Sequence, residues 1–186
     1  IYREYEEQRK RRRKIDFDDM LVLCFQLFLS RPDVLRGWQK KFRYILIDEF
    51  QDINQIQFEV VKLLAGEQRT LFVVGDDDQS IYRFRGAKPE IMLRFEREIP
   101  GTKTVLLDTN YRSQANIVED ALNLIGHNKE RFQKRIRAAL PAETGVEYAV
   151  FEDQRKENLR IIRDICDAVE RGKSYRDFAV LFRTNT

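Results

Sequence analysis

Blocks of apolar and polar residues alternate along the chain with spacings that predict strands and helices in turn. Short apolar runs at 44–47, 71–74 and 104–107 are typical of buried parallel strands. The patterns at 146–150 and 178–182 predict two more strands. Apolar residues recur at helical spacing in the segments 20–29, 53–64, 91–95, 117–125 and 161–169.

Residues with strong preferences for helix ends flank these helical segments. A polar stretch over 126–144 predicts a loop or hinge. Because strands and helices alternate, we expect an α/β protein with a parallel sheet flanked by helices. The helix-end residues are Asp16 and Ser113 as N-caps, Pro89 in a first turn, and Gly66 and Gly172 beyond C-termini.

The composition describes a globular chain with a charged surface. Of 186 residues, 42% are hydrophobic and 35% are charged, which excludes a wholly disordered chain. No apolar run approaches the ~20 residues that span a bilayer, and no signal peptide opens the sequence, so we expect a cytosolic protein without a membrane partner. The chain begins inside a helical pattern and ends after a strand-like run, so we expect both ends to be cuts through a larger protein.

Charge and isolated reactive residues give weaker signals. The net charge is only +3, and the basic run 9–14 could lie near phosphate, although a solvated helix face is the favoured interpretation. Cys24 and Cys166 are predicted to be buried free thiols rather than a disulfide or a metal site. His127 lacks partners at ligand spacing, so we interpret it as a helix-end or loop residue.

The residues directly after each predicted strand carry the candidate chemistry, because ligands of open parallel sheets bind beyond the carboxyl ends of the strands. Asp48 and Glu49 follow the first strand. Such a pair suits nucleotide hydrolysis, since the first acid can hold Mg²⁺ through water and the second can orient or deprotonate the attacking water. Acids at a helix N-terminus, favoured by the helix dipole, explain the pair equally well.

The loop after the second strand combines acids, an amide and aromatic residues. Gln79 can touch a γ-phosphate, and Tyr82 and Phe84 alternate with arginines in a pattern suited to stacking on unpaired bases. An ordinary half-buried loop is the alternative. The acids 76–78 lack the alternate spacing of Ca²⁺ loops, which disfavours a metal-dependent nuclease. After the third strand, Arg112 could reach a phosphoryl group or be a surface arginine.

In this order and spacing, three segments resemble motifs II, III and IV of the UvrD/Rep-type superfamily I DNA helicases. They are LIDEFQDINQIQ, VVGDDDQSIYRFRGA and LDTNYRS, and the flanking DFDDML and AVLFRTN also resemble family segments. The resemblance covers nearly the whole chain. It implies P-loop NTPase (RecA-like) motor domains, with the carboxyl-terminal half of the first in residues 1–107 and the start of the second in residues 108–186.

The resemblance implies roles for single residues around ATP and Mg²⁺. Asp48 would be the Mg²⁺ ligand and Glu49 the catalytic base. Gln79 would contact both the γ-phosphate and the attacking water. From the second motor domain, Tyr111 would stack on the adenine and Arg112 would act as an arginine finger.

The resemblance also implies contacts with single-stranded DNA. Tyr82 and Phe84 would stack on bases, and Arg85 would tie their loop to the nucleotide cleft. Arg183 and Asn185 would lie near DNA. Because the family usually has tryptophan where Phe84 stands, we expect stacking from a smaller ring. These roles imply ATP-driven movement on single-stranded DNA and unwinding at duplex junctions, together with the rest of the same polypeptide, in a bacterial cytosol or nucleoid and in processes such as DNA repair.

One part of the family pattern does not occur in the 186 residues. No GxxxxGK[ST] phosphate loop is present, so we expect the isolated chain to be inactive in hydrolysis. Two alternatives therefore stay open. One is a non-catalytic single-strand-binding or docking module with a degenerate helicase fold, and the other is the motor part of a helicase–nuclease.

Overall fold

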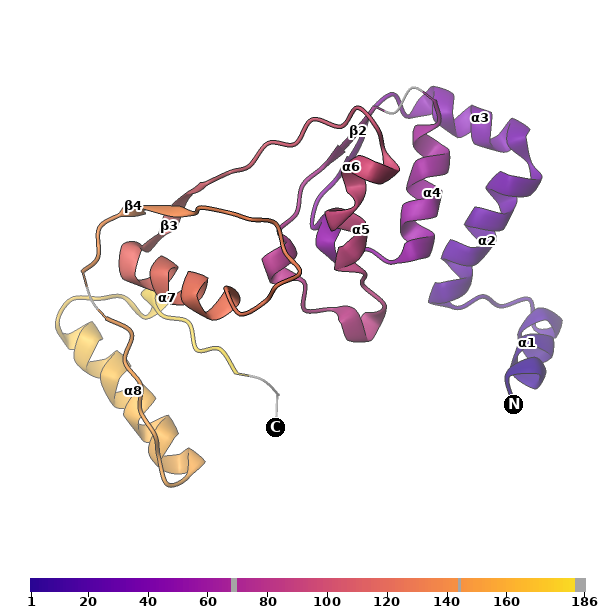
Figure 1. Cartoon of the computed structure of the whole chain (residues 1–186). Coiled ribbons are helices and arrows are strands. Elements are labelled where there is room, and N and C mark those ends of the chain that lie inside the picture. The colour runs from indigo at the N-terminus through magenta and orange to yellow at the C-terminus, as the bar shows by residue number, and fades with distance from the viewer. Residues whose placement is uncertain (68–69, 144, 183–186) are drawn as a thin grey trace. The chain divides into compact units, whose positions relative to one another are not determined.

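The computed structural model describes residues 1–67, 70–143 and 145–182, and it shows a mixed α/β fold with short parallel sheets (Figure 1). Its contacts group into two compact units, Ile1–Pro141 and Ala142–Thr186. The parallel strands and flanking helices confirm the predicted α/β class. Within the described ranges, no helix combines the length and the apolar character needed to cross a membrane.

Three helices open the first unit: α1 (Tyr2–Arg11), α2 (Phe17–Ser30) and α3 (Pro32–Lys41). The predicted cap Asp16 is confirmed, because its Oδ1 accepts a hydrogen bond from the Asp19 backbone N–H at 2.8 Å. In return, Asp19 Oδ2 accepts from the Asp16 N–H at 2.9 Å. This reciprocal capping satisfies two backbone donors at the helix start. Pro32 then ends α2 and suits the first turn of α3.

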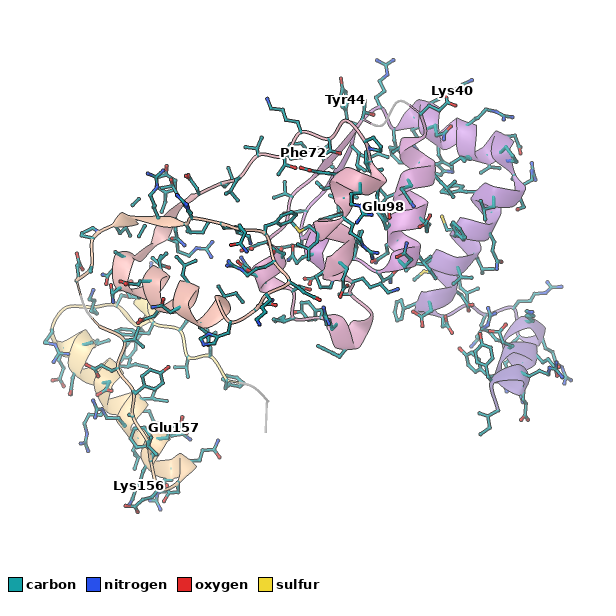
Figure 2. The ribbon with its side chains drawn as sticks, viewed as in Figure 1. Lys40, Tyr44, Phe72, Glu98, Lys156 and Glu157 are labelled. Atoms are coloured by element: carbon teal, nitrogen blue, oxygen red, sulfur yellow. The ribbon has the colours of Figure 1, made fainter. Side chains whose placement is uncertain are left out.

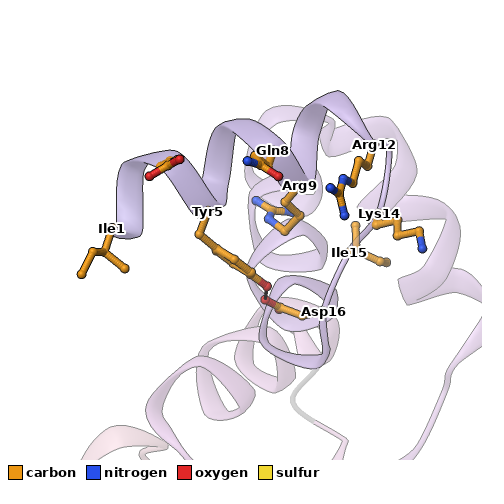
Figure 3. Close-up of a pocket in the computed structure, with 9 residues that line it drawn as sticks. Ile1, Tyr5, Gln8, Arg9, Arg12, Lys14, Ile15 and Asp16 are labelled. Atoms are coloured by element: carbon orange, nitrogen blue, oxygen red, sulfur yellow. Dashed lines mark hydrogen bonds between the residues drawn. The ribbon is translucent and has the colours of Figure 1, made fainter.

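Side-chain contacts tie α1 to the start of α2 (Figure 3). Tyr5 Oη donates to Asp16 Oδ2 at 2.6 Å, and the Arg9 guanidinium pairs with Asp19 at 2.5 Å. Only 10% of the Arg9 side chain is exposed. The charge of Arg9 is therefore paired with the carboxylates of Glu6 and Asp19, whereas residues 11–14 of the basic run are exposed.

The first sheet pairs β1 (Ile45–Ile47) with β2 (Leu71–Val73) in parallel, as predicted from the two apolar runs. The connection between them is α4 (Gln55–Ala65), which Asn54 caps at its start and Gly66 follows with a φ of +56°. A positive φ at this point suits glycine, as the sequence predicts for the end of this helix. α2, α3 and α4 contact one another beside the sheet (Figure 1).

Aromatic rings fill the core under one face of this sheet. The cluster consists of Phe50, Phe58, Phe95 and Ile91, from the loop after β1 and from α4, α5 (Pro89–Leu93) and α6 (Phe95–Glu98). The Phe50 ring meets the other two rings edge to face, with centroids 6.0 and 5.2 Å apart. The alternate strand residues Leu46 and Phe72 are exposed on the other face (Phe72 in Figure 2).

The predicted third strand at 104–107 is wrong, because in the described residues this apolar run has no neighbouring strand and its side chains are exposed. The strand lies slightly later, at β3 (Thr109–Gln114), and pairs in parallel with β4 (Arg137–Leu140). β4 lies within the stretch 126–144 that was predicted to be a loop. The Arg137 backbone N–H donates to the Asp108 carbonyl at 2.8 Å, which gives this polar segment the partner that a strand requires.

The helix between these strands, α7 (Ala115–Ile125), is confirmed, but its predicted cap is wrong. Ser113 lies in β3, and Gln114 occupies the N-cap position without a side-chain capping bond. The Ser113 backbone N–H instead donates to Asn110 Oδ1 at 2.8 Å. The Asn110 side chain therefore organises a local turn directly before the helix.

The second unit contains α8 (Gln154–Glu170), which Asp153 caps and Gly172 follows with a φ of +100°. Figure 2 labels Lys156 and Glu157 near the start of this helix. The predicted strands at 146–150 and 178–182 are wrong, since the described part of this unit contains no strand. Val150 is 99% exposed. A segment with an apolar pattern forms a strand only where a neighbouring strand provides backbone hydrogen bonds.

Candidate functional site

The acidic pair Asp48 and Glu49 lies at the carboxyl end of β1. The Val74 N–H donates to the Ile47 carbonyl at 2.8 Å, and the Phe50 N–H donates to the Val74 carbonyl at 2.9 Å. The strand pairing therefore continues on both sides of the acids and fixes their backbone. Both side chains are exposed, so they are open to a ligand at the sheet edge.

The backbone of Glu49 turns sharply at this point. Its φ of +50° and ψ of +43° place it in the left-handed region, which costs about 1–2 kcal/mol for a residue with a Cβ. Asp48 Oδ1 accepts the Glu49 backbone N–H at 2.9 Å. Backbone strain of this kind is typical of functional positions.

Gln51 connects this turn to the loop after β2. Its Nε2 donates to Glu49 Oε2 at 2.7 Å, and its Oε1 accepts the Asp76 backbone N–H at 3.0 Å. The side chain is 1% exposed. Gln51 was not predicted as a site residue, because an amide close to acids in sequence gives no signal that it is buried.

Gly75 allows the two loops to approach each other. A Cβ at this position would lie 2.7 Å from Gln51 Oε1 and 3.1 Å from the Phe50 backbone nitrogen. These separations are below ordinary van der Waals contact, and the second involves backbone that cannot move easily. The absence of a side chain at residue 75 is therefore required for the Gln51 contacts.

Gln79 lies in the same loop, at the end of the short 3₁₀ helix η2 (Asp77–Gln79). Its Nε2 donates to Asp76 Oδ2 at 2.8 Å, and its side chain is exposed. Asp48, Glu49 and Gln79 thus follow the paired strands at one edge of the sheet, and Gln51 and Asp76 link Glu49 to Gln79.

The two candidate stacking residues form an aromatic pair at the 3₁₀ helix η3 (Arg83–Arg85), which Tyr82 precedes and which contains Phe84. The centroids of the Tyr82 and Phe84 rings are 6.0 Å apart with an interplanar angle of 47°. Tyr82 is 37% exposed and Phe84 is 78% exposed, so flat aromatic surface is available to solvent. The side chain of Arg85, and all of Arg183 and Asn185, lie outside the described residues.

Tyr111 and Arg112 stand on an irregular part of β3. The β3–β4 register shifts between Asn110 and Gln114, and the Asn110 side-chain oxygen accepts the Arg112 backbone N–H at 2.9 Å. Such bulges re-aim side chains, and both Tyr111 and Arg112 are exposed. In the described part of the chain, no hydrogen bond or ion pair joins either side chain to the acids after β1.

The three acids 76–78 are held by cations from the segment after α7. Lys134 Nζ lies 2.5 Å from Asp77 Oδ1 and 3.0 Å from Asp78 Oδ2, and it also contacts Asp76. Arg131 donates two hydrogen bonds to Asp78, at 2.7 and 2.6 Å. The three carboxylates lie close enough together to hold a metal ion, but these cations already offset their charge. Nothing in the local sequence around Arg131 and Lys134 identified them as partners.

The cluster changes the pKa values of its members in opposite directions. Burial opposes ionisation of Asp76, but hydrogen bonds from Lys134 and Gln79 lower the pKa of this carboxyl group below its usual value. The Arg131 hydrogen bond lowers the pKa of Asp78. Burial acts to lower the pKa of Lys134, yet the three carboxylates raise it overall. Each group is therefore stabilised in its charged form.

Asp48 provides a carboxylate that suits Mg²⁺. The side chain is exposed, and among the described residues it makes no ion pair with a basic group. Mg²⁺ usually keeps several waters and takes one or two protein carboxylates together with phosphate oxygens. An exposed acid at a strand end fits that pattern.

The other reactive residues make no site in the described chain. His127 Nδ1 lies 3.1 Å from the Asn123 and Leu124 carbonyls, which confirms a helix-end histidine. Cys24 and Cys166 are free, as predicted, but they are half-buried rather than buried.

Two helicase families match the chain in order. The UvrD/REP helicase N-terminal domain matches residues 1–100, and the UvrD-like helicase C-terminal domain matches residues 105–186. The chain is 44% identical over 187 residues to YjcD of Bacillus subtilis (strain 168), whose name describes an ATP-dependent DNA helicase. It is 40% identical over 185 residues to the ATP-dependent DNA helicase PcrA of Staphylococcus epidermidis, and 41% over 186 residues to PcrA of Leuconostoc citreum.

These alignments cover all of the chain and 24% to 25% of each relative. The chain therefore spans about a quarter of the length of the curated relatives it matches.

Replacing Lys134 should destabilise the protein in a pH-dependent way. At neutral pH, we expect Lys134→Met to lower the free energy of unfolding by about 1.5–3 kcal/mol, because it leaves charged hydrogen-bond acceptors without their partner. Carboxyl groups with a depressed folded-state pKa contribute stability above their unfolded pKa and lose it as the pH falls through the folded pKa. The difference should therefore shrink on acidification below the ordinary aspartate range.

Urea unfolding of both proteins across the acidic and neutral range measures this difference. The control is Lys129→Met, which removes an exposed lysine from the same segment. A loss that stays constant with pH, or that the control reproduces, would contradict the assignment of the cluster.

Proposed function

The chain belongs to the UvrD/Rep helicase family, and we propose that it is the central part of a longer ATP-dependent DNA helicase. The relatives whose names describe such helicases align with the entire chain, which spans about a quarter of their length. The proposed division puts residues 1–107 in the first motor domain and residues 108–186 in the second. The order of the two family matches supports this division, because one ends at residue 100 and the other begins at residue 105.

The observation that carries the proposal is the joined strand-end site. Asp48, Glu49 and Gln79 follow the two paired strands at one sheet edge, and Glu49 is connected to Gln79 through Gln51 and Asp76. Hydrolysis of a nucleoside triphosphate needs a metal-binding carboxylate, a group that activates water and a neutral contact to the terminal phosphate. These three side chains supply those functions in that order.

ATP would be clamped between this edge and residues of the second motor domain. Mg²⁺ held by Asp48 would offset the charge of the β- and γ-phosphates. Glu49 would accept the proton of the attacking water, and Gln79 would contact the γ-phosphate. Tyr111 would stack on the adenine, and Arg112 would stabilise charge on the transferring phosphoryl group. Tyr111 and Arg112 are exposed on the irregular part of β3, which supports a role in binding a ligand.

The aromatic pair Tyr82 and Phe84 would grip single-stranded DNA. These rings follow directly after the loop that carries Gln79, so a change at the nucleotide can move them. Closure on ATP and opening after hydrolysis would then shift the stacked bases and step the protein along the strand toward a duplex junction. Arg85, Arg183 and Asn185 are proposed to contribute further contacts near DNA. We also place the helicase in a bacterial cytosol or nucleoid.

Removing the proposed base should separate hydrolysis from binding. In the complete polypeptide, we expect Glu49→Gln to lower the ATP turnover number by about 10²- to 10⁴-fold, because the amide cannot accept the proton. The affinity for ATP should stay near that of the parent. Steady-state hydrolysis and binding of a fluorescent ATP analogue measure the two quantities.

Glu67→Gln, which changes an exposed glutamate outside the site, is the matched control for this substitution. Turnover of Glu49→Gln close to that of the parent would refute the catalytic role. Absence of hydrolysis in the parent itself would favour the non-catalytic binding module.

Truncating either aromatic ring should weaken the grip on DNA. We expect Tyr82→Ala and Phe84→Ala each to lower the affinity for single-stranded oligonucleotides by about 1–3 kcal/mol, the usual contribution of one stacked base. Phe84→Trp should bind at least as tightly as the parent, since the larger ring covers more of a base. Fluorescence anisotropy at fixed salt concentration provides the measurement. Tyr148→Ala, at a residue that is 97% exposed, should leave the affinity unchanged, and an equal loss in this control would contradict the assignment.

A further inference from the structure

Gln51 is an unusual side chain for its position. Among the described residues, it is the polar side chain with the lowest exposure, at 1%, and it lies next to the aromatic core residue Phe50. A buried amide is unfavourable unless its donor and acceptor are both hydrogen-bonded. In Gln51 both ends have partners, so the burial of the amide is balanced by two specific contacts.

The chemistry of the partners fixes the orientation of the amide. The Glu49 carboxylate oxygen accepts a hydrogen bond here, and the Asp76 backbone N–H can only donate one. Exchanging the amide nitrogen and oxygen would break both contacts, so only one orientation is possible. The Ser80 hydroxyl donates to the Gln51 carbonyl at 3.3 Å and holds the backbone on the other side.

A continuous chain of hydrogen bonds runs through Gln51. Glu49 Oε2 is 2.7 Å from Gln51 Nε2, and Gln51 Oε1 is 3.0 Å from the Asp76 nitrogen. Asp76 Oδ2 then accepts from Gln79 Nε2 at 2.8 Å. The amide therefore lies between the side chain proposed to activate water and the loop that carries the proposed γ-phosphate contact.

We propose that Gln51 is a positioning residue for ATP hydrolysis. It holds the Glu49 carboxylate in place and ties it to the Asp76–Gln79 loop, so that the base and the phosphate contact keep one relative position. This inference rests on the proposed function, since it assumes that Glu49 is the base. Gln51 acts through Glu49 and does not itself touch the reacting atoms.

The test replaces the amide with a side chain of similar size. In the complete polypeptide, Gln51→Met keeps the length of the side chain and removes both hydrogen bonds. We expect the turnover number to fall about 10- to 100-fold, as a misplaced catalytic group does, while KM for ATP changes less than about twofold. Gln55→Met is the matched control, because Gln55 is exposed on α4 and its amide donates to Glu59 on the same helix, at 2.8 Å. Its turnover should equal that of the parent.

A double-mutant cycle separates positioning from a purely structural role. If Gln51 acts through Glu49, adding Gln51→Met to Glu49→Gln should cause no further loss in single-turnover hydrolysis. An equal loss in both backgrounds would overturn the proposal and leave the proposed function intact. A Glu49→Gln protein that hydrolyses ATP like the parent would instead overturn both.

The stoichiometry of ATP-analogue binding shows whether each variant is folded. If Gln51→Met binds less than one nucleotide per protein, Gln51→Glu replaces it in the cycle. This variant keeps an acceptor for the Asp76 N–H but loses the donor to Glu49, so the proposal again requires a lower turnover number with no additional effect in the Glu49→Gln background. An unchanged turnover number in Gln51→Glu would overturn the proposal.

Discussion

The parallel pairing of two three-residue strands is the constraint on which the candidate site depends. β1 and β2 end at the same edge, and the Val74 backbone continues the pairing to Ile47 on one side and Phe50 on the other. Because of this pairing, two loops 25 residues apart in sequence meet through the contact between Gln51 and Asp76. The aromatic core under the sheet holds the loop after β1 from below, through Phe50. The candidate side chains at this edge are therefore positioned by backbone hydrogen bonds and by packing.

A second layer of interactions joins this edge to the chain that follows α7. Lys134 and Arg131 neutralise the acids 76–78, and the Phe132 backbone N–H donates to Asp77 Oδ2 at 2.8 Å. These contacts cross the proposed boundary between the two motor domains. Buried ion pairs stabilise a protein only while both partners stay in place. This cluster would therefore be sensitive to any movement of one proposed domain against the other.

The sequence predicted correctly those strands whose apolar pattern also has a neighbouring strand in the structure. The runs at 44–47 and 71–74 are strands because each lies beside the other, whereas the equally apolar run at 104–107 has no neighbour among the described residues. β3 was missed because its sequence, TNYRSQ, is polar and owes its strand form to β4. The candidate residues themselves were predicted from their positions after the strands and from the order and spacing of three motifs. Gln51 and Lys134 were not, because residue type alone reveals neither burial nor a partner distant in sequence.

The proposed function is tested most sharply by the rate of ATP hydrolysis by the complete polypeptide, measured with and without single-stranded DNA. Gln79 and the aromatic pair lie on one continuous loop, from Asp76 to Phe84, so a ligand bound at the proposed nucleotide site should affect the rings proposed to hold DNA. We expect hydrolysis that requires Mg²⁺ and that single-stranded DNA accelerates. Hydrolysis that is absent, or that is the same with and without DNA, would contradict it.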